Sequence, residues 1–191
     1  NFIKFLFILC SFIYSSHRCG FLDEINLNDF QRTRPQTDTY ASSPSGHFNI
    51  HYDLSGDDAP SQIDSDLNGI PDYVDEVGII ADSSRYVLVN IMGFLPEPND
   101  DDAIYDIYLQ DLGPGYYGVN MLDTDFGVGP SYIKIDNEYE SGDYFIPGIN
   151  TMRLTVAHEF FHAIQRSYRA YPTSLTGFFY EMSSTWIEDV I

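Results

Sequence analysis

The chain has 191 residues, of which 43% are hydrophobic and 16% aromatic, enough for one domain with a sizeable core. Twenty-nine acidic residues against nine basic ones give a formal net charge of −20. Because phosphate groups repel such a surface, the composition excludes nucleic acid as an expected partner and disfavours an anionic membrane surface. It fits a soluble protein, or one that binds cations.

The first 16 residues have the features of a secretory signal. Lys4 precedes an apolar run over residues 5–14, which is too short to span a membrane comfortably. Ser15 and Ser16 are small, but the residues two positions before them are large, so the cleavage site is poorly formed. We predict a signal peptide at residues 1–16 and a secreted protein without stable membrane association once the signal is removed. A signal anchor is the alternative.

The two cysteines do not suggest a disulfide framework. Cys10 lies in the predicted signal, so Cys19 is left as a single cysteine in the mature chain. Residues 17–45 are polar and contain two X-Pro steps, which is typical of a linker or pro-segment. We therefore place the folded domain at residues 46–191.

Hydrophobic patterning predicts the elements of that domain. Alternation of apolar residues predicts strands at residues 47–54, 103–112 and 131–139. Apolar residues at helical spacing predict helices at residues 73–92, 151–171 and 178–191. The Gly-rich stretch 113–130 is expected to be a loop.

The second predicted helix carries the HExxH pattern, as HEFFH at residues 158–162. Residues four apart lie on one helix face, so His158 and His162 can bind the same metal ion. Glu159 lies about 100° further round the helix, where its carboxylate can reach a metal-bound water without being a ligand. The apolar residues share the opposite face, namely Leu154, Ala157, Phe160, Phe161, Ile164 and Tyr168. We expect that face to pack into the core while the motif addresses a cleft.

The pattern alone leaves two interpretations open, because two histidines on a helix can also be surface residues without a metal. A catalytic zinc site has three protein ligands and one open position. No histidine follows His162, but Glu181 follows it with 18 residues between, the HExxH-x18-E spacing.

Several blocks of the sequence resemble those of a known protein family. The block TVAHEFFHAIQ followed by FFYEMSSTWIED resembles the gluzincin peptidases. The order of the blocks NGIPDYVDEV, YDIYL, SYIKIDNEY and HEFFHAIQ is similar to that of a group of secreted bacterial zinc proteases. This similarity runs from about His47 to the end of the chain.

The resemblance implies an α+β, zincin-like fold with a mixed or antiparallel sheet, a packing helix, an active-site helix and a third-ligand helix. It implies that His158, His162 and Glu181 bind zinc (Zn2+) and that Glu159 is the catalytic base. We expect the chain to be the front part of such a domain, incomplete at its C-terminus. The GxMEN motif of many aminopeptidases is absent, which favours an endopeptidase.

In the mechanism implied, zinc lowers the pKa of its bound water and Glu159 accepts the proton, then returns it to the leaving amine of a peptide or protein substrate. Glu188 lies two helical turns after Glu181, so it either orients a ligand imidazole or is an exposed acid. The strand at 131–139 either aligns the substrate as an edge strand, by analogy with zincins, or is an ordinary strand of the sheet.

A second metal site is predicted in the acidic stretch before the first helix. Its oxygen spacing is that of an EF-hand-type loop, with Gly69 at the sharp turn. The candidate calcium (Ca2+) ligands are Asp64, Asp66, Asn68, the carbonyl of Ile70, Asp72 and Asp75. The alternative is an acidic, Asx-rich turn that caps the following helix.

Two functional hypotheses follow. The first is a secreted zinc peptidase, and the second is a non-catalytic, secreted, calcium-binding recognition module that retains the zincin fold. The intact HExxH pattern favours the first, because a binding module does not need Glu159. A zinc hydrolase that acts on a non-peptide bond is a third possibility.

Overall fold

The computed structural model describes residues 19, 33–100, 102–113, 115–123, 129–140, 144, 147–168 and 177–191. The predicted signal peptide lies outside these ranges, as does much of the predicted linker. Within them, none of the helices has the length and apolar character needed to cross a bilayer.

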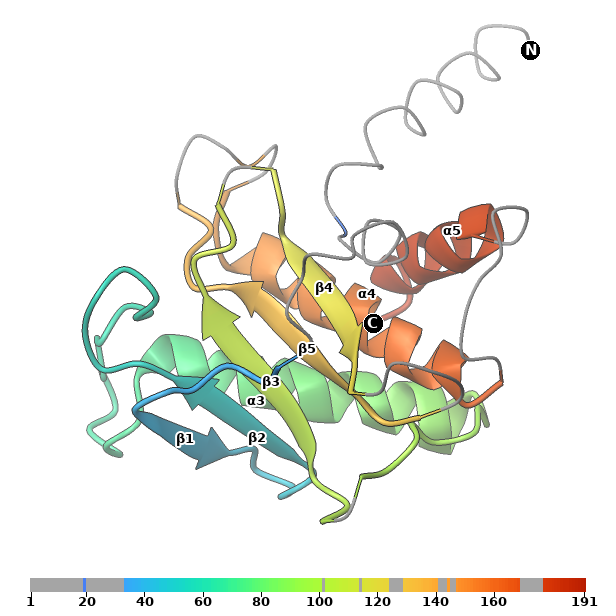
Figure 1. Cartoon of the computed structure of the whole chain (residues 1–191), viewed down its shortest axis with the longest axis horizontal. Helices are drawn as coiled ribbons and strands as arrows, with labels where there is room; N and C mark the ends of the chain where they lie inside the picture. The colour runs from blue at the N-terminus through green and yellow to red at the C-terminus, as the bar shows by residue number, and fades with distance from the viewer. Residues whose placement is uncertain are drawn as a thin grey trace, which may run out of the picture.

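The described residues form an α+β fold built on one five-stranded mixed sheet (Figure 1). The strands are β1 (Thr39–Ser42), β2 (Phe48–Tyr52), β3 (Tyr105–Gln110), β4 (Gly118–Leu122) and β5 (Ser131–Asp136). Their order is β1-β2-β3-β5-β4. The three inner strands run parallel, while β1 and β4 are antiparallel to their neighbours. The predicted α+β class is confirmed.

The helices lie on one face of this sheet (Figure 1). They are α3 (Asp72–Arg85), which continues as a π-helical turn (Tyr86–Ile91), α4 (Ile149–Arg166) and α5 (Gly177–Glu188). Helix α3 packs on β1 and β2, α4 packs on β4 and β5, and the two helices contact each other. Helix α5 packs against α4. All three helices lie where the sequence pattern predicts them.

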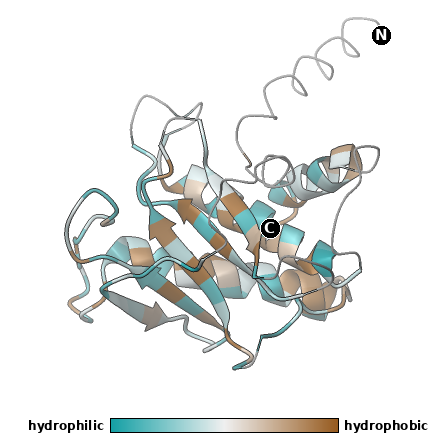
Figure 2. Cartoon of the chain, viewed as in Figure 1, coloured by the Kyte–Doolittle hydropathy of each residue, from teal (hydrophilic) through white to brown (hydrophobic). Residues whose placement is uncertain are grey.

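The core lies between the sheet and helices α3 and α4. Hydrophobic and hydrophilic residues alternate along much of the sheet (Figure 2), and β2, β3 and β5 each contribute an apolar side to the core. On β2 this side consists of Phe48, Ile50 and Tyr52, all buried. The ring of Phe160 on α4 lies 5.2 Å from that of Phe48 and 5.7 Å from that of Tyr105. Burying such a side chain contributes about 1.5–3 kcal/mol, which holds α4 on the sheet.

Two segments expected to be irregular are strands. β4 lies within the predicted loop 113–130, and β1 lies within the predicted linker 17–45. Both are short edge strands, of five and four residues, whose conformation comes from pairing with β5 and β2. The domain boundary predicted at residue 46 therefore falls inside the sheet.

Of the two interpretations of residues 131–139, the ordinary strand of the sheet is confirmed and the edge strand is wrong. β5 lies between β3 and β4 and pairs with both. The edge on this side of the sheet is β4.

Arg34, which precedes β1, binds to the face of the sheet opposite the helices. Its guanidinium pairs with Asp123 at 2.6 Å and with Asp100 at 2.7 Å, and it also pairs with Asp106. It lies 5.6 Å from the centre of the Tyr132 ring. The hydrogen bond to Asp123 and the surrounding negative charge raise the pKa of Arg34 despite its burial. One cation therefore joins three acidic side chains from separate parts of the chain.

We predict that Arg34→Ala lowers the free energy of unfolding by about 2–4 kcal/mol, because Asp106 keeps two acidic neighbours without their cation. The carboxylate of Asp106 cannot relax into water, since the residue is only 6% exposed. Urea unfolding followed by circular dichroism measures the loss. The matched control is Arg153→Ala, which removes an exposed pair with Glu76 and should cost less than about 1 kcal/mol. Similar losses in the two variants would contradict a structural role for Arg34.

Candidate metal centre

Helix α4 places the two histidines of the HExxH pattern one turn apart, with their Nε2 atoms 3.2 Å from each other. His158, Glu159 and His162 are all buried. The expectation of an open cleft on this side is therefore not met, because α5 packs over the motif. On the apolar side, Leu154 and Tyr168 are exposed while the other four predicted residues are buried.

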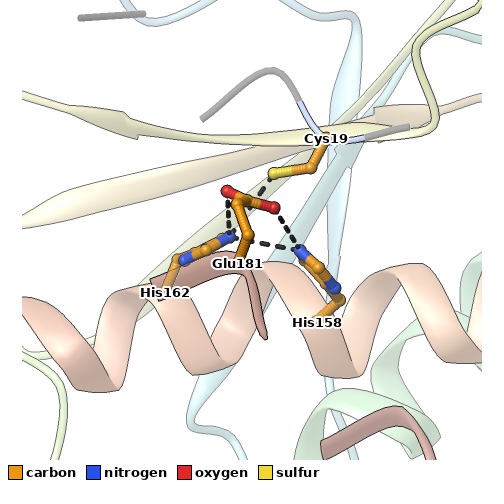
Figure 3. Close-up of side chains that lie close together, drawn as sticks. All are labelled: Cys19, His158, His162 and Glu181. Carbon is orange, nitrogen blue, oxygen red and sulfur yellow. Dashed lines mark hydrogen bonds and ion pairs between the residues drawn. The ribbon is translucent and has the colours of Figure 1, made fainter. Parts of the chain in front are cut away.

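Helix α5 brings Glu181 to both imidazoles (Figure 3). Its Oε2 lies 3.5 Å from Nε2 of His158, and its Oε1 lies 3.4 Å from Nε2 of His162. Ligand atoms about 2.0–2.2 Å from a zinc ion at tetrahedral angles are about 3.3–3.5 Å apart. The two imidazole nitrogens lie 3.2 Å apart, and each oxygen of Glu181 lies 3.4–3.5 Å from one of them, so the separations are close to that spacing.

The outward-facing nitrogen of each imidazole has its own partner. Nδ1 of His158 lies 2.7 Å from Oε1 of Glu188. Nδ1 of His162 lies 2.8 Å from Oε1 of Gln165 and 3.2 Å from Oγ of Ser184. Such partners fix the ring orientation and leave Nε2 to face a metal, as in most protein sites with histidine ligands. Of the two interpretations of Glu188, the structure supports contact with a ligand imidazole.

Gln165 was not singled out from the sequence. Besides contacting His162, its amide nitrogen donates hydrogen bonds to the carbonyl of Tyr180 at 3.0 Å and to Oγ of Ser183 at 2.9 Å. It therefore joins α4 to α5 at the centre. The only feature of the sequence that pointed to this contact was the spacing of three residues between His162 and Gln165 on a predicted helix.

Burial and neighbouring charges shift the pKa values of Glu159, Glu181 and His158. Burial raises the pKa of Glu159, although the neighbouring imidazoles oppose the change. Burial also acts to raise the pKa of Glu181, but the charges and hydrogen bonds of His162 and His158 lower it overall. Burial acts to lower the pKa of His158, but hydrogen bonds to Glu181 and Glu188 raise it to about 10. The cluster therefore favours additional positive charge, from protons or from a cation.

Two buried carboxylate oxygens support a cation. Within the described residues, Oε2 of Glu159 has no hydrogen-bond donor, and the contact of Oε1 of Glu181 with Nε2 of His162, at 3.4 Å, is an ion pair without hydrogen-bond geometry. Leaving a buried polar atom without a hydrogen bond costs about 1–3 kcal/mol, and the cost is higher for a charged group. Two imidazole nitrogens and one carboxylate are also a donor set typical of catalytic zinc. The residues present fit a zinc ion.

A fourth potential ligand is Cys19, which is 6% exposed. Its Sγ lies 3.4 Å from Nε2 of His162 (Figure 3). Together with His158, His162 and Glu181 it supplies four ligand atoms that all lie within 4.8 Å of one another. The sequence marked Cys19 as a single cysteine but contained nothing that placed it here.

Strand β4 comes unusually close to α4 beside Glu159. A Cβ atom added to Gly118 would lie 2.7 Å from Cγ2 of Thr155 and 2.8 Å from Cγ of Glu159, so this position requires glycine. Two residues further along β4, the Asn120 carbonyl accepts a 2.8 Å hydrogen bond from buried Arg166. These contacts fix the sheet edge against α4.

The predicted calcium loop is only partly assembled. Carboxylate oxygens of Asp64, Asp66 and Asp72 lie within 4.8 Å of one another. Asp75 instead accepts a 2.7 Å hydrogen bond from the side-chain amide of Asn68. The structure thus brings together three of the six predicted ligands directly.

The remaining contacts of the loop are those of an Asx-rich turn. Asp64 accepts a 2.9 Å hydrogen bond from the backbone of Gly69, and Asn68 Oδ1 accepts one of 2.7 Å from the backbone of Ile70. Pro71 precedes α3 without a side-chain cap, so the capping part of the alternative interpretation is not observed.

No protein-family model matches this chain, and no curated protein or solved structure matches it either. A functional assignment therefore depends on the chemistry of the site itself.

We predict that Glu188→Ala weakens zinc binding about 10–100-fold, because the imidazole of His158 loses the carboxylate that orients it and raises its basicity. Competition against a chromophoric chelator measures the affinity. The adjacent exposed acid offers a matched control, so Asp189→Ala should leave zinc affinity unchanged. An equal effect of the two substitutions would mean that Glu188 acts only through overall charge.

The calcium hypothesis stays a prediction with a direct test. Calcium at ten times its dissociation constant should stabilise the parent by about 1.4 kcal/mol and raise its melting temperature. The Asp64→Ala/Asp66→Ala variant should not respond, whereas Asp57→Ala, which removes an exposed acid nearby, should respond like the parent. An equal response of the parent to magnesium chloride would indicate screening of charge rather than a site.

Proposed function

We propose that this chain carries the metal centre of a secreted zinc metallopeptidase with a zincin-like fold. The observation that carries the proposal is the convergence of His158, His162 and Glu181, from two helices, at the mutual distances of tetrahedral zinc ligands. Glu159 lies buried beside them, on the next residue of the same helix. A recognition module would have no use for a buried carboxylate at that position.

In this proposal His158 and His162 hold zinc through Nε2, and Glu181 holds it through its carboxylate. A bound zinc ion polarises a peptide carbonyl and lowers the pKa of a coordinated water molecule. Glu159 is the proton acceptor, and its Oε2, which has no hydrogen-bond donor among the described residues, is the atom that receives the proton. Burial raises the pKa of Glu159, which makes its carboxylate a stronger base for accepting that proton. The same proton then passes from Glu159 to the leaving amine.

The substrate strand in this proposal pairs with β4 rather than with residues 131–139. β4 is the sheet edge beside Glu159, and Gly118 brings its backbone to within contact of that side chain. An extended peptide can add to an exposed strand edge through backbone hydrogen bonds. A peptide bound in this way would pass directly over the catalytic base.

The second candidate is the secreted calcium-binding module, which the grouping of Asp64, Asp66 and Asp72 favours. One chain could bind both calcium and zinc, because the acidic loop and the proposed zinc centre lie on different elements. They differ in whether Glu159 is needed for activity.

We predict that the purified chain holds about one equivalent of zinc, and that His158→Ala and Glu181→Ala reduce it strongly, because each removes a ligand. Glu159→Gln should retain zinc, since Glu159 is not a ligand, but should lower proteolysis of casein by about 100-fold or more. Zinc is measured by atomic absorption and proteolysis by release of soluble peptides. A parent chain that binds no zinc would contradict the proposal.

A further inference from the structure

We propose that Cys19 is a fourth ligand at this metal centre, and that Cys19 keeps the peptidase latent by occupying the place of the reacting water and of the substrate backbone. The inference depends on the proposed function, because a latent form has meaning only if His158, His162 and Glu181 hold zinc.

The first support is the position of the thiol. Sγ of Cys19 lies 3.4 Å from Nε2 of His162, and a sulfur and a nitrogen bound to one tetrahedral zinc ion lie about 3.6 Å apart. Cysteine sulfur is a strong zinc ligand, and the thiol releases its proton to solvent when it binds. Zinc with four protein ligands is typical of structural sites, whereas catalytic sites keep one position open. Cys19 would therefore fill the position that a reacting water needs.

The second support is the burial of the unsatisfied acids around the thiol. Glu159 is 1% exposed, and its Oε2 has no hydrogen-bond donor in the described part of the chain. The thiol of Cys19 also forms a hydrogen bond with the Glu159 side chain. Cys19 thus contacts both a proposed zinc ligand and the proposed base, so it lies where water and the reacting carbonyl would have to be.

The third support is the pairing of Cys19 with the sheet edge. Cys19 forms an isolated parallel bridge with Gly118, the first residue of β4. The backbone of β4 beside Glu159 is therefore already paired, and an extended substrate cannot pair there at the same time. One residue thus blocks both requirements of the proposed reaction, access to the metal and alignment on β4.

The anchor at Arg34 indicates which part of the chain can leave. Arg34 is held by three carboxylates, and β1 follows it in the sheet. Release of Cys19, which precedes this anchor, would free the centre while Arg34 keeps its contacts with the three carboxylates. Cys19 lies on the side of the anchor that can be released.

X-ray absorption at the zinc edge tests the ligand directly in the full chain. The parent should show a sulfur neighbour at about 2.3 Å in addition to nitrogen and oxygen neighbours at about 2.0–2.2 Å. Cys19→Ser should keep its zinc and its circular dichroism spectrum but lose the sulfur neighbour. Cys10→Ser, which alters the other cysteine, is the matched control and should keep it.

A proteolysis assay tests latency separately from the binding of Cys19 to zinc. Cys19→Ser should cleave casein about tenfold or more faster than the parent, because the open form is no longer a minor population. Adding Glu159→Gln to that variant should abolish the gain. Cys19→Ala is made in parallel, so that a folding defect of one variant does not hide the result.

The outcomes distinguish the two proposals. Zinc bound by the parent without a sulfur neighbour would overturn the role of Cys19 and leave the proposed peptidase standing. A sulfur neighbour without any gain of activity in either Cys19 variant, or loss of zinc from both, would overturn latency. No zinc in the parent or in the Cys19 variants would overturn the proposed function itself.

Discussion

The docking of α5 on α4 is the contact on which the candidate centre depends. Helix α4 alone supplies two imidazoles, which are not enough to hold a catalytic zinc ion. The third candidate ligand, Glu181, lies on α5. Helix α5 is held on α4 by hydrogen bonds from Gln165 to the Tyr180 carbonyl and to Ser183, and by burial of Ile187. These contacts position Glu181 between the histidines. The same packing buries the centre, so one interaction both assembles the site and encloses it.

Because the centre is enclosed, the charges of its side chains must be compensated. Around two buried imidazoles lie the buried Glu159 and the partly buried Glu181 and Glu188, and burying charge without compensation is costly. A divalent cation would offset this cost and satisfy the carboxylate oxygens that face inward. The chain as a whole carries 29 acidic residues, so an acidic centre fits the rest of the molecule. What distinguishes the centre from the acidic surface is burial together with two inward-facing imidazole nitrogens.

Under the proposed function, strand β4 links the centre to recognition of a polypeptide. Gly118 lets the strand touch Glu159, while the bonds between Arg166 and Asn120 hold it in register against α4. An edge strand held in this way can pair with one extended segment at a time. In the structure Cys19 forms an isolated bridge with Gly118 of this strand. Substrate binding and latency would therefore compete for the same backbone groups, without any change in the sheet itself.

By itself the sequence determined what local patterns encode. Helical period placed His158, Glu159 and His162 on one turn, and alternation located β2, β3 and β5, because both patterns depend only on neighbours in the chain. Tertiary structure decided the rest. The edge strands β1 and β4 were missed because short strands owe their conformation to their partners. The approach of Cys19 to His162, 143 residues away in the chain, depends on packing between distant segments, which no local pattern specifies.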